Sequence, residues 1–501
     1  MKREKSTFFM IVLSAIASAA FLLVCSLSTT PLLQYSPGQD SAFFRLVGVG
    51  MTKGLLPYQD FFDMKGPYLF WIQYLGQLIS PGRLGIFLVQ WLAMTISVFF
   101  FFRCLKLADE KMPLWGCVLL LLPMGYVMSY TMTGGNLTEE WSMPFLSICL
   151  YLFLRWLRGA GTQDAEAQDH AMWAGFFYGV VFGILALIRV TNAALVGAIL
   201  LTVTCDLIVW KRWKNLLENA GMFLLGVAAG VLPGILWCLA KGILGEMLSQ
   251  VFFFGFAYSG ETGLLDSLHT MGLVRWCLLL PLLPVVPLAL YRERDWRRWL
   301  FFAASAFATV LAALMGNGYC HYFVLAIPNL VFAAFLFAEG QKKAREPAQK
   351  KARAVVSMAL VLAVLGAQWP LFRPRALEEV RYAMYCAVTH TEDQEDYDAV
   401  QAIVKQIPEE NTVYVYGFPS CSAFYIQAGL LPPNQYCDWQ PHYIQLDPEI
   451  GSQIEGYLRA GKAQFVVTPL EGAEPEQIRR ALEETYRSIY TAAGYRLWQT
   501  K

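Results

Sequence analysis

Charged residues are scarce in this sequence. Asp, Glu, Lys and Arg make up 15% of its 501 residues, against roughly a quarter in ordinary soluble domains. So few charges exclude an ordinary water-facing fold, because 56% of the residues are apolar and need another environment. The net charge of +1 indicates no polyanionic partner, so the composition does not predict binding to nucleic acid.

Several motifs are absent as well. The eleven cysteines are scattered, and no CxxC pair or Cys/His cluster predicts a zinc site. No GxGxxG or Walker loop is present, so the sequence predicts no nucleotide-sugar site. For Cys421 and Cys437 two alternatives stay open, a disulfide in an oxidising compartment or two free thiols.

Long apolar segments are what the chain has instead. A helix needs roughly 18 or more apolar residues to cross the hydrocarbon core of a bilayer. Such segments lie near 8–27, 84–102, 113–130, 141–156, 172–189, 192–210, 219–240, 270–290, 298–316, 321–338 and 354–371. The sequence therefore predicts a polytopic α-helical membrane protein with about eleven transmembrane helices.

The loops between these segments alternate in charge. One set carries 21 Lys and Arg residues, whereas the alternate set carries five in loops of greater total length. Because cytoplasmic loops are enriched in Lys and Arg, this asymmetry predicts a cytoplasmic N-terminus in the plasma membrane. An odd number of spans then places the C-terminus outside.

The composition changes after residue 375, which predicts two domains. Residues 1–375 form the transmembrane domain, with a first outer loop at about 28–83 that contains amphipathic helices. Residues 376–501 read as a small soluble extracytoplasmic α/β domain, with strands at 412–417, 464–469 and 495–499 between helical segments.

Polar side chains from separate outer loops form the candidate site. Charges near a membrane span cost on the order of 2.5 to 3.5 kcal/mol each, so those present usually line a site or an aqueous cavity. A carboxylate can accept a hydroxyl proton as a general base. Lys and Arg can neutralise a phosphate, including a leaving phosphate. The candidates on the predicted outer side are Asp40, Tyr58, Asp63, Lys65, Glu139, Glu140, Arg189, His321 and Tyr322.

The order of these motifs resembles a known superfamily. An acid in the first outer loop precedes the element PYQDFFDMKGP (57–67), then the TEE segment (138–140) and an intramembrane arginine. This pattern is similar to the GT-C superfamily of glycosyltransferases that use polyprenyl-phosphate sugars. Nearest in pattern are bacterial enzymes akin to protein O-mannosyltransferases and to the aminoarabinose transferase of lipid A.

The resemblance implies roles for individual residues. It makes Asp40 the catalytic base and gives Asp63 and Lys65 of DMKGP a place in the site, although Gly66 stands where the family often has proline. It makes Arg189 a phosphate ligand. It also allows a divalent metal ion that the sequence does not require, since the later outer loop has no histidine before His269.

Each candidate also has a structural interpretation. Asp40 can begin a helix, Asp63 and Lys65 can pair with each other, and the acids at 139 and 140 can interact with the positive end of a helix. Arg189 can extend to the membrane interface, and His321 can be a packed interfacial side chain. The tyrosines Tyr58 and Tyr322 are included as aromatic walls of the substrate site.

The leading hypothesis is an inverting glycosyltransferase with a lipid-phosphate donor and an extracytoplasmic glycan, lipid or protein acceptor. The alternatives are a transporter or flippase of lipid-linked sugars and a polymerase or ligase of whole glycans. Transporters usually place polar groups near mid-membrane in two related halves. This sequence shows no repeated half and few charges at mid-span.

Overall fold

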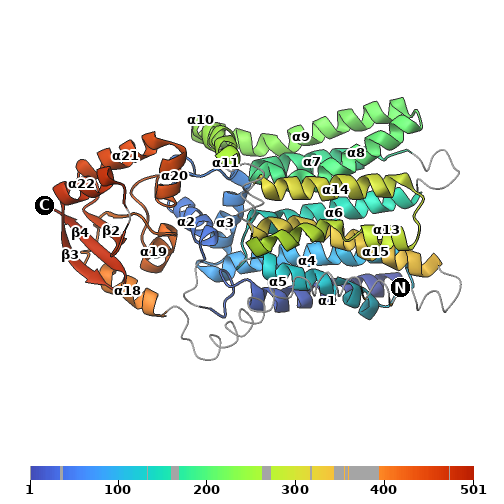
Figure 1. Cartoon of the computed structure of the whole chain (residues 1–501), viewed down its shortest axis with the longest axis horizontal. Helices are drawn as coiled ribbons and strands as arrows, with labels where there is room; N and C mark the ends of the chain where they lie inside the picture. The colour runs from blue at the N-terminus through green and yellow to red at the C-terminus, as the bar shows by residue number, and fades with distance from the viewer. Residues whose placement is uncertain are drawn as a thin grey trace. The chain divides into compact units, whose positions relative to one another are not determined.

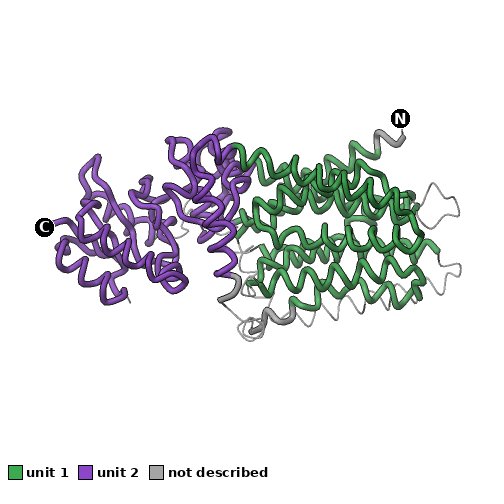
Figure 2. The backbone as a smooth tube through the Cα atoms, turned by 90° about the horizontal axis from the view of Figure 1, so that it is seen from above, with its two compact units in different colours: residues 1–26, 89–236, 262–381 green, residues 27–88, 237–261, 382–501 purple. Residues whose placement is uncertain are grey.

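The computed structural model describes residues 2–33, 38–132, 134–159, 169–261, 272–315, 319–343, 394–472 and 474–501, together with Val355 and Ala359. The chain divides into two compact units (Figure 2). Unit 1 comprises residues 1–26, 89–236 and 262–381, and unit 2 comprises residues 27–88, 237–261 and 382–501.

Unit 1 is built from long helices (Figure 1). The α-helices that lie in it wholly or in large part are α1 (Lys2–Cys25), α4 (Arg83–Ala108), α5 (Leu114–Thr131), α6 (Thr138–Gly159), α7 (Met172–Arg189), α8 (Ala194–Val209), α9 (Trp213–Lys241), α13 (Val285–Leu290), α14 (Trp296–Leu314) and α15 (Ile327–Lys343). Three 3-10 segments join them, η2 (Val190–Ala193), η4 (Gly272–Leu282) and η5 (Cys320–Ala326).

Seven segments among the described residues are long and apolar enough to span a membrane: Ser6–Cys25, Arg83–Ala108, Leu114–Thr131, Met172–Val209, Trp213–Lys241, Trp296–Leu314 and Cys320–Lys343. The predicted membrane protein of helical class is therefore confirmed, but the predicted number of helices is not. Met172–Val209 contains two predicted spans, and α6 carries four charges in its 22 residues. Cys277–Leu290 is shorter than a span, and the predicted helix at 354–371 lies outside the described residues.

Glycines allow two of these helices to approach closely. A methyl group on Gly179 in α7 would lie 2.1 Å from the carbonyl oxygen of Phe223 in α9. A methyl group on Gly226 in α9 would lie 2.1 Å from the carbonyl oxygen of Phe176 in α7. Such contacts leave no room for a Cβ atom, so these small residues allow close helix packing.

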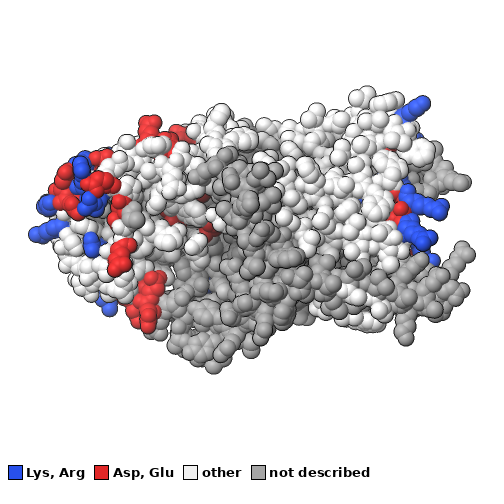
Figure 3. All heavy atoms as spheres, viewed as in Figure 1, with Lys and Arg blue, Asp and Glu red and all other residues white. Residues whose placement is uncertain are grey.

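The two ends of unit 1 differ in charge. Glu139 at the start of α6 pairs with Arg189 at the end of α7, and Asp206 near the end of α8 pairs with Arg297 at the start of α14. Neighbouring helices therefore run antiparallel. Figure 3 shows Lys and Arg side chains gathered at one end of unit 1. We call this the basic end; it contains the ends of α8 and α15 and the start of α14.

Unit 2 contains short helices and the only sheet that the described residues form. The helices are α2 (Asp40–Thr52), α3 (Pro67–Ile79), α10 (Leu244–Leu248), the π-helix η3 (Ser249–Phe254), α11 (Gly255–Glu261), α18 (Gln394–Val404), α19 (Cys421–Ala428), α20 (Gln440–Leu446), α21 (Pro448–Arg459) and α22 (Glu476–Thr485). The strands are β1 (Val413–Val415), β2 (Phe465–Pro469), β3 (Tyr486–Ala492) and β4 (Tyr495–Thr500).

The sheet has the order β1-β2-β4-β3, with β1 and β2 parallel and the other pairs antiparallel. The three predicted strands are confirmed as β1, β2 and β4. The sequence analysis missed β3, whose side chains are mostly exposed at the edge of the sheet. Such a strand lacks the apolar alternation that identifies a half-buried one. The predicted domain boundary near 375 lies outside the described residues.

Phe62 ties the first loop to the rest of unit 2. Its ring lies 4.9 Å from that of Phe254 and 5.0 Å from that of Tyr443, centroid to centroid. Its amide donates to the carbonyl of Gln435 at 3.0 Å. The predicted first loop, the segment around η3 and the C-terminal region thus share one aromatic core, which fixes the loop that carries the candidate acids.

Candidate functional site

Arg189 lies at the end of α7, where the helix is distorted. Leu187 has non-helical backbone angles of φ −100° and ψ 17°, and Arg189 itself is extended at φ −162°. The chain then continues as η2 before α8 begins. The helix α7 therefore ends in a long cation, away from the basic end.

A carboxylate and an aromatic ring hold the Arg189 guanidinium. Its Nη1 donates to Oε1 of Glu139 at 2.8 Å, and the same oxygen accepts the Thr138 hydroxyl at 2.8 Å. Its Cζ lies 3.8 Å from the ring centroid of Tyr322, a cation–π contact. Glu139 is 1% exposed and the Arg189 side chain 15% exposed. The arginine is therefore positioned by buried groups and is itself reachable from solvent.

His321 extends this aromatic side of the cluster. Its ring centroid lies 4.3 Å from that of Tyr322, and it stacks on Tyr319 at 5.7 Å with the planes 8° apart. His321 and Tyr322 lie in the first turn of η5. The structure therefore brings Glu139, Arg189, His321 and Tyr322 together, and we call these four residues the arginine cluster.

Glu140 has different neighbours from the adjacent Glu139. Its Oε1 accepts from the Gln90 side-chain amide at 2.6 Å, and its Oε2 accepts from the Asn136 backbone amide at 2.8 Å. Asn136 lies at φ 64°, after Gly134 and Gly135, which also have positive φ. Glu140 thus links α4 to the tight turn before α6 by hydrogen bonds, whereas Glu139 forms an ion pair with Arg189.

Asp40 is the first residue of α2 in unit 2. Gln39 precedes it as the N-cap residue and makes no side-chain capping bond. The Asp40 side chain is half-buried, and it forms no hydrogen bond or ion pair with another described residue. A carboxylate at a helix start lies near the positive end of the helix dipole. Its oxygens stay available to accept a proton.

Asp63 and Tyr58 are bound into the loop before α3. Oδ1 of Asp63 accepts the Lys65 amide at 2.6 Å, and the Tyr58 hydroxyl donates to the Lys65 carbonyl at 2.8 Å. The Gln250 side chain accepts the Asp63 amide at 3.1 Å and donates to the Tyr58 carbonyl at 2.8 Å. Tyr58 adopts φ 71°. This network stabilises the strained backbone of Tyr58 and fixes the backbone of Lys65.

Charge and burial oppose each other at Asp63. Burial raises the pKa of its carboxyl, while the Lys65 charge and the Lys65 amide lower it, and Asp40 raises it further. The net result is a raised pKa. The Lys65 side chain is half-buried and forms no hydrogen bond or ion pair with other described residues. Asp40, Tyr58, Asp63 and Lys65 form the first-loop group of unit 2.

The sequence identified both groups but missed the residues that support them. Gln90 and Gln250 lie in apolar helical segments and Asn136 in a loop, so no local motif distinguishes them. A polar residue within an apolar span is the one signal that could have indicated Gln90. The roles assigned to the nine candidates stay predictions. The arginine cluster belongs to unit 1 and the first-loop group to unit 2.

No set of three or more His, Cys, Asp or Glu side chains is grouped as a metal site in the described ranges. The metal dependence therefore stays an open prediction. Cys421 and Cys437 are buried free thiols, so the structure contains the second of the two alternatives for this pair.

Comparison with known proteins gives a family and a fold. Residues 2–372 match the family model of the competence-induced protein Ccs4 N-terminal domain. Among curated proteins no sequence matches the chain.

Several solved structures resemble the chain over most of its length. ArnT from Cupriavidus metallidurans bound to undecaprenyl phosphate is 14% identical with a TM-score of 0.59, and 97% of each chain is covered. Apo ArnT from the same organism is also 14% identical, with a TM-score of 0.52 and the same coverage. The apo oligosaccharyltransferase of Archaeoglobus fulgidus is 13% identical, with a TM-score of 0.46 over 98% of this chain and 74% of that one. The two ArnT structures show that the chain has the GT-C fold.

Proposed function

This chain belongs to the family of the competence-induced protein Ccs4 N-terminal domain, and we propose that it is a membrane glycosyltransferase with a polyprenyl-phosphate-linked donor. The GT-C fold and the undecaprenyl phosphate bound by the structurally similar ArnT support this donor class. The acceptor is an extracytoplasmic glycan, lipid or protein, and the membrane is the plasma membrane. The N-terminus lies in the cytoplasm, because the loops on its side carry 21 Lys and Arg residues and the alternate loops carry five.

The observation that carries the proposal is the arginine cluster. Arg189 ends α7 away from the basic end, and its side chain is partly exposed. A guanidinium can bind two phosphate oxygens in parallel. Tyr322 and His321 add an apolar and polarisable surface beside it. A cation of this kind at the membrane boundary suits the phosphate of a lipid whose tail stays in the bilayer.

The proposed reaction is an inverting displacement. Asp40 accepts the proton of an acceptor hydroxyl, whose oxygen attacks the anomeric carbon of the sugar. The bond between that carbon and the phosphate oxygen breaks, and the electron pair leaves with the lipid phosphate. Arg189 stabilises the charge that develops on this phosphate, and Lys65 adds a second cation. The products are a glycosylated acceptor of inverted configuration and free polyprenyl phosphate.

Asp63 and the remaining residues have supporting roles in this proposal. Burial raises the pKa of the Asp63 carboxyl above its ordinary value, and its bond from the Lys65 amide holds the first loop in place. Tyr58 fixes the loop that carries Lys65, and Glu139 orients Arg189. Glu140 supports the turn before α6.

The test is release of polyprenyl phosphate by the purified full-length protein from a panel of polyprenyl-phosphate sugars. We expect at least one donor to be cleaved, and Asp40→Asn to reduce transfer by about 10²- to 10⁴-fold, the usual contribution of a general base. Asp60→Asn in the same loop is the control, because Asp60 accepts the Leu56 amide at 2.7 Å and is not assigned to the site.

Wild-type transfer by a folded Asp40→Asn variant would exclude Asp40 as the base. Movement of sugar-lipid across a vesicle membrane without release of polyprenyl phosphate would instead support the transporter hypothesis and contradict transfer. Transfer of whole glycan chains in preference to single sugars would identify a polymerase or ligase.

A further inference from the structure

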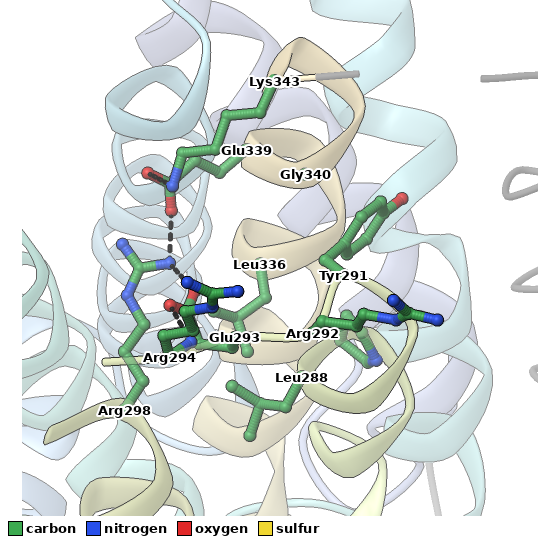
Figure 4. A pocket seen from close by; sticks show the side chains of 11 residues that line it. Leu288, Tyr291, Arg292, Glu293, Arg294, Arg298, Leu336, Glu339, Gly340 and Lys343 are labelled. Carbon is green, nitrogen blue, oxygen red and sulfur yellow. Dashed lines mark hydrogen bonds and ion pairs between the residues drawn. The ribbon is translucent and has the colours of Figure 1, made fainter. Parts of the chain in front are cut away.

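A polar pocket lies at the basic end of unit 1. It has a volume of about 240 Å³ and lies between the last residues of α13, the start of α14 and the end of α15 (Figure 4). Four cations and two carboxylates line it: Arg292, Arg294, Arg298, Lys343, Glu293 and Glu339. We call it the basic pocket. The proposed transfer reaction uses none of its residues.

The two carboxylates of the basic pocket are already paired. Arg298 donates to Glu293 at 2.7 Å and to Glu339 at 2.6 Å, as the dashed lines in Figure 4 show. Lys343 lies 3.0 Å from the second oxygen of Glu339. These pairs neutralise one another and leave the charges of Arg292 and Arg294 unmatched within the pocket.

Arg292 and Arg294 are exposed, and their side chains form no hydrogen bond or ion pair with another described residue. Arg292 also has a left-handed backbone at φ 49°. The Glu293 amide donates to the Leu288 carbonyl and the Arg292 amide to the Ala289 carbonyl, the pattern that ends a helix with a left-handed residue. Glycine usually occupies that position, because a larger residue there costs roughly 1 to 2 kcal/mol. Arg292 thus occupies a position where glycine would give a more stable helix end.

The inner wall of the basic pocket is apolar. Leu288 is fully buried and Leu336 is 4% exposed. The Tyr291 ring packs directly on Gly340, since a methyl group at that glycine would lie 2.4 Å from a ring carbon. The pocket thus combines an apolar base with unmatched cations at its rim, at the end of membrane-spanning helices where a bilayer changes from acyl chain to headgroup.

We propose that the basic pocket binds the phosphate headgroup of an anionic membrane lipid. Basic pockets between transmembrane helices attract such headgroups. The volume favours a headgroup over a complete metabolite, because sites for drug-sized ligands are usually about 300 to 1,000 Å³. An apolar wall next to the phosphate suits a ligand with an acyl chain better than a free anion. This site is separate from the arginine cluster, and its function does not depend on the proposed glycosyl transfer.

The test is native mass spectrometry of the full-length protein, titrated with phosphatidylglycerol or with phosphatidylcholine of the same acyl chains. We expect the wild type to retain phosphatidylglycerol in preference to phosphatidylcholine. The variant Arg292→Gly should weaken this retention by about fivefold, the effect of one cation near an anionic headgroup. Glycine suits the left-handed position, so the variant should fold at least as stably as the wild type.

The chain contains a matched control. Lys211 is exposed, follows α8 at the same basic end and has φ 54°, with the same pattern of amide bonds at the helix end. Lys211→Gly therefore removes one cation and relieves the same backbone strain outside the pocket. We expect it to leave lipid retention unchanged, and Arg292→Gly with Arg294→Gln to weaken retention by roughly 25-fold.

Other results would overturn the proposal. Equal losses in Arg292→Gly and Lys211→Gly would indicate diffuse attraction by the whole basic end. Equal retention of the two lipids, or no retained lipid in the wild type, would show that the pocket does not select an anionic headgroup. Displacement of phosphatidylglycerol by inorganic phosphate at equal concentration would identify a site for a free anion. None of these results would bear on donor cleavage.

Discussion

The two ends of unit 1 use buried arginines in different ways. At the basic end, Arg298 lies between the carboxylates of Glu293 and Glu339, and its side chain is 8% exposed. At the other end, Arg189 lies between the carboxylate of Glu139 and the face of the Tyr322 ring, and its side chain is 15% exposed. Arg189 ends α7, and Arg298 lies in the first turn of α14.

The difference concerns how fully each charge is neutralised. Two carboxylates balance Arg298 and join α14 to α15 and to the segment after α13, so its role is to hold helices together. An aromatic face attracts a cation by about 0.5 to 2 kcal/mol without cancelling its charge. Glu139 and the Tyr322 ring together therefore fix the orientation of Arg189. An arginine between two carboxylates thus joins helices, whereas an arginine held by one carboxylate and an aromatic ring has a fixed orientation, as a binding residue must have.

The first prediction concerns the stability that the ion pairs at the basic end provide. Arg298→Met leaves Glu293 and Glu339 without the cation between them, and breaking a buried ion pair in this way costs about 3 to 5 kcal/mol. We expect the free energy of unfolding in detergent to fall by that amount. Arg294→Met is the control, because Arg294 is exposed and should change stability by less than about 0.5 kcal/mol.

An Arg298→Met protein as stable as the wild type would break the comparison. It would mean that the network of ion pairs at the basic end does not hold α14 and α15 together.

Substitution of Arg189 should lower transfer more than stability, unlike substitution of Arg298. Arg189→Gln removes the cation proposed to stabilise the leaving phosphate, and loss of one such group typically lowers kcat by about 10²- to 10³-fold. We expect transfer to fall by this factor, with a smaller loss of stability than in Arg298→Met. Arg189→Lys keeps the charge but cannot bind two phosphate oxygens in parallel, so it should restore part of kcat. Equal kcat values for Arg189→Gln and the wild type would exclude a role for this cation in the transition state.

Much of the fold and of the difference between the two ends of unit 1 could be predicted from the sequence. Apolar segment length and Lys/Arg asymmetry identified the membrane class and the basic end, because insertion into a bilayer constrains composition directly. The three buried strands of unit 2 carry short apolar runs and were predicted, whereas the exposed edge strand β3 was missed. Arg189 was selected because a charge in a membrane span is rarely accidental.

The partners of these residues could not be predicted from the sequence. The Arg189–Glu139 pair joins positions 50 residues apart, and the Gln250 bonds to the first loop join positions about 190 residues apart. Neither pair has a local pattern, because helix periodicity describes one helix and not its neighbours. The different roles of Glu139 and Glu140 follow from which helix each side chain faces, which depends on packing.

That difference gives the last and smallest prediction. Glu139→Gln retains a hydrogen-bond acceptor but removes the charge that orients Arg189, so transfer should fall by about tenfold, which is 1.4 kcal/mol. Glu140→Gln keeps an acceptor for only one of its two donors, Gln90 or the Asn136 amide, so stability should fall by about 1 kcal/mol. Transfer should change by less than about twofold, because neither donor belongs to the arginine cluster. The measurement is kcat and the unfolding midpoint of both variants. Equal losses of kcat would show that both acids serve Arg189, whereas a larger loss in Glu140→Gln would show that the turn before α6, and not the ion pair, controls the arginine cluster.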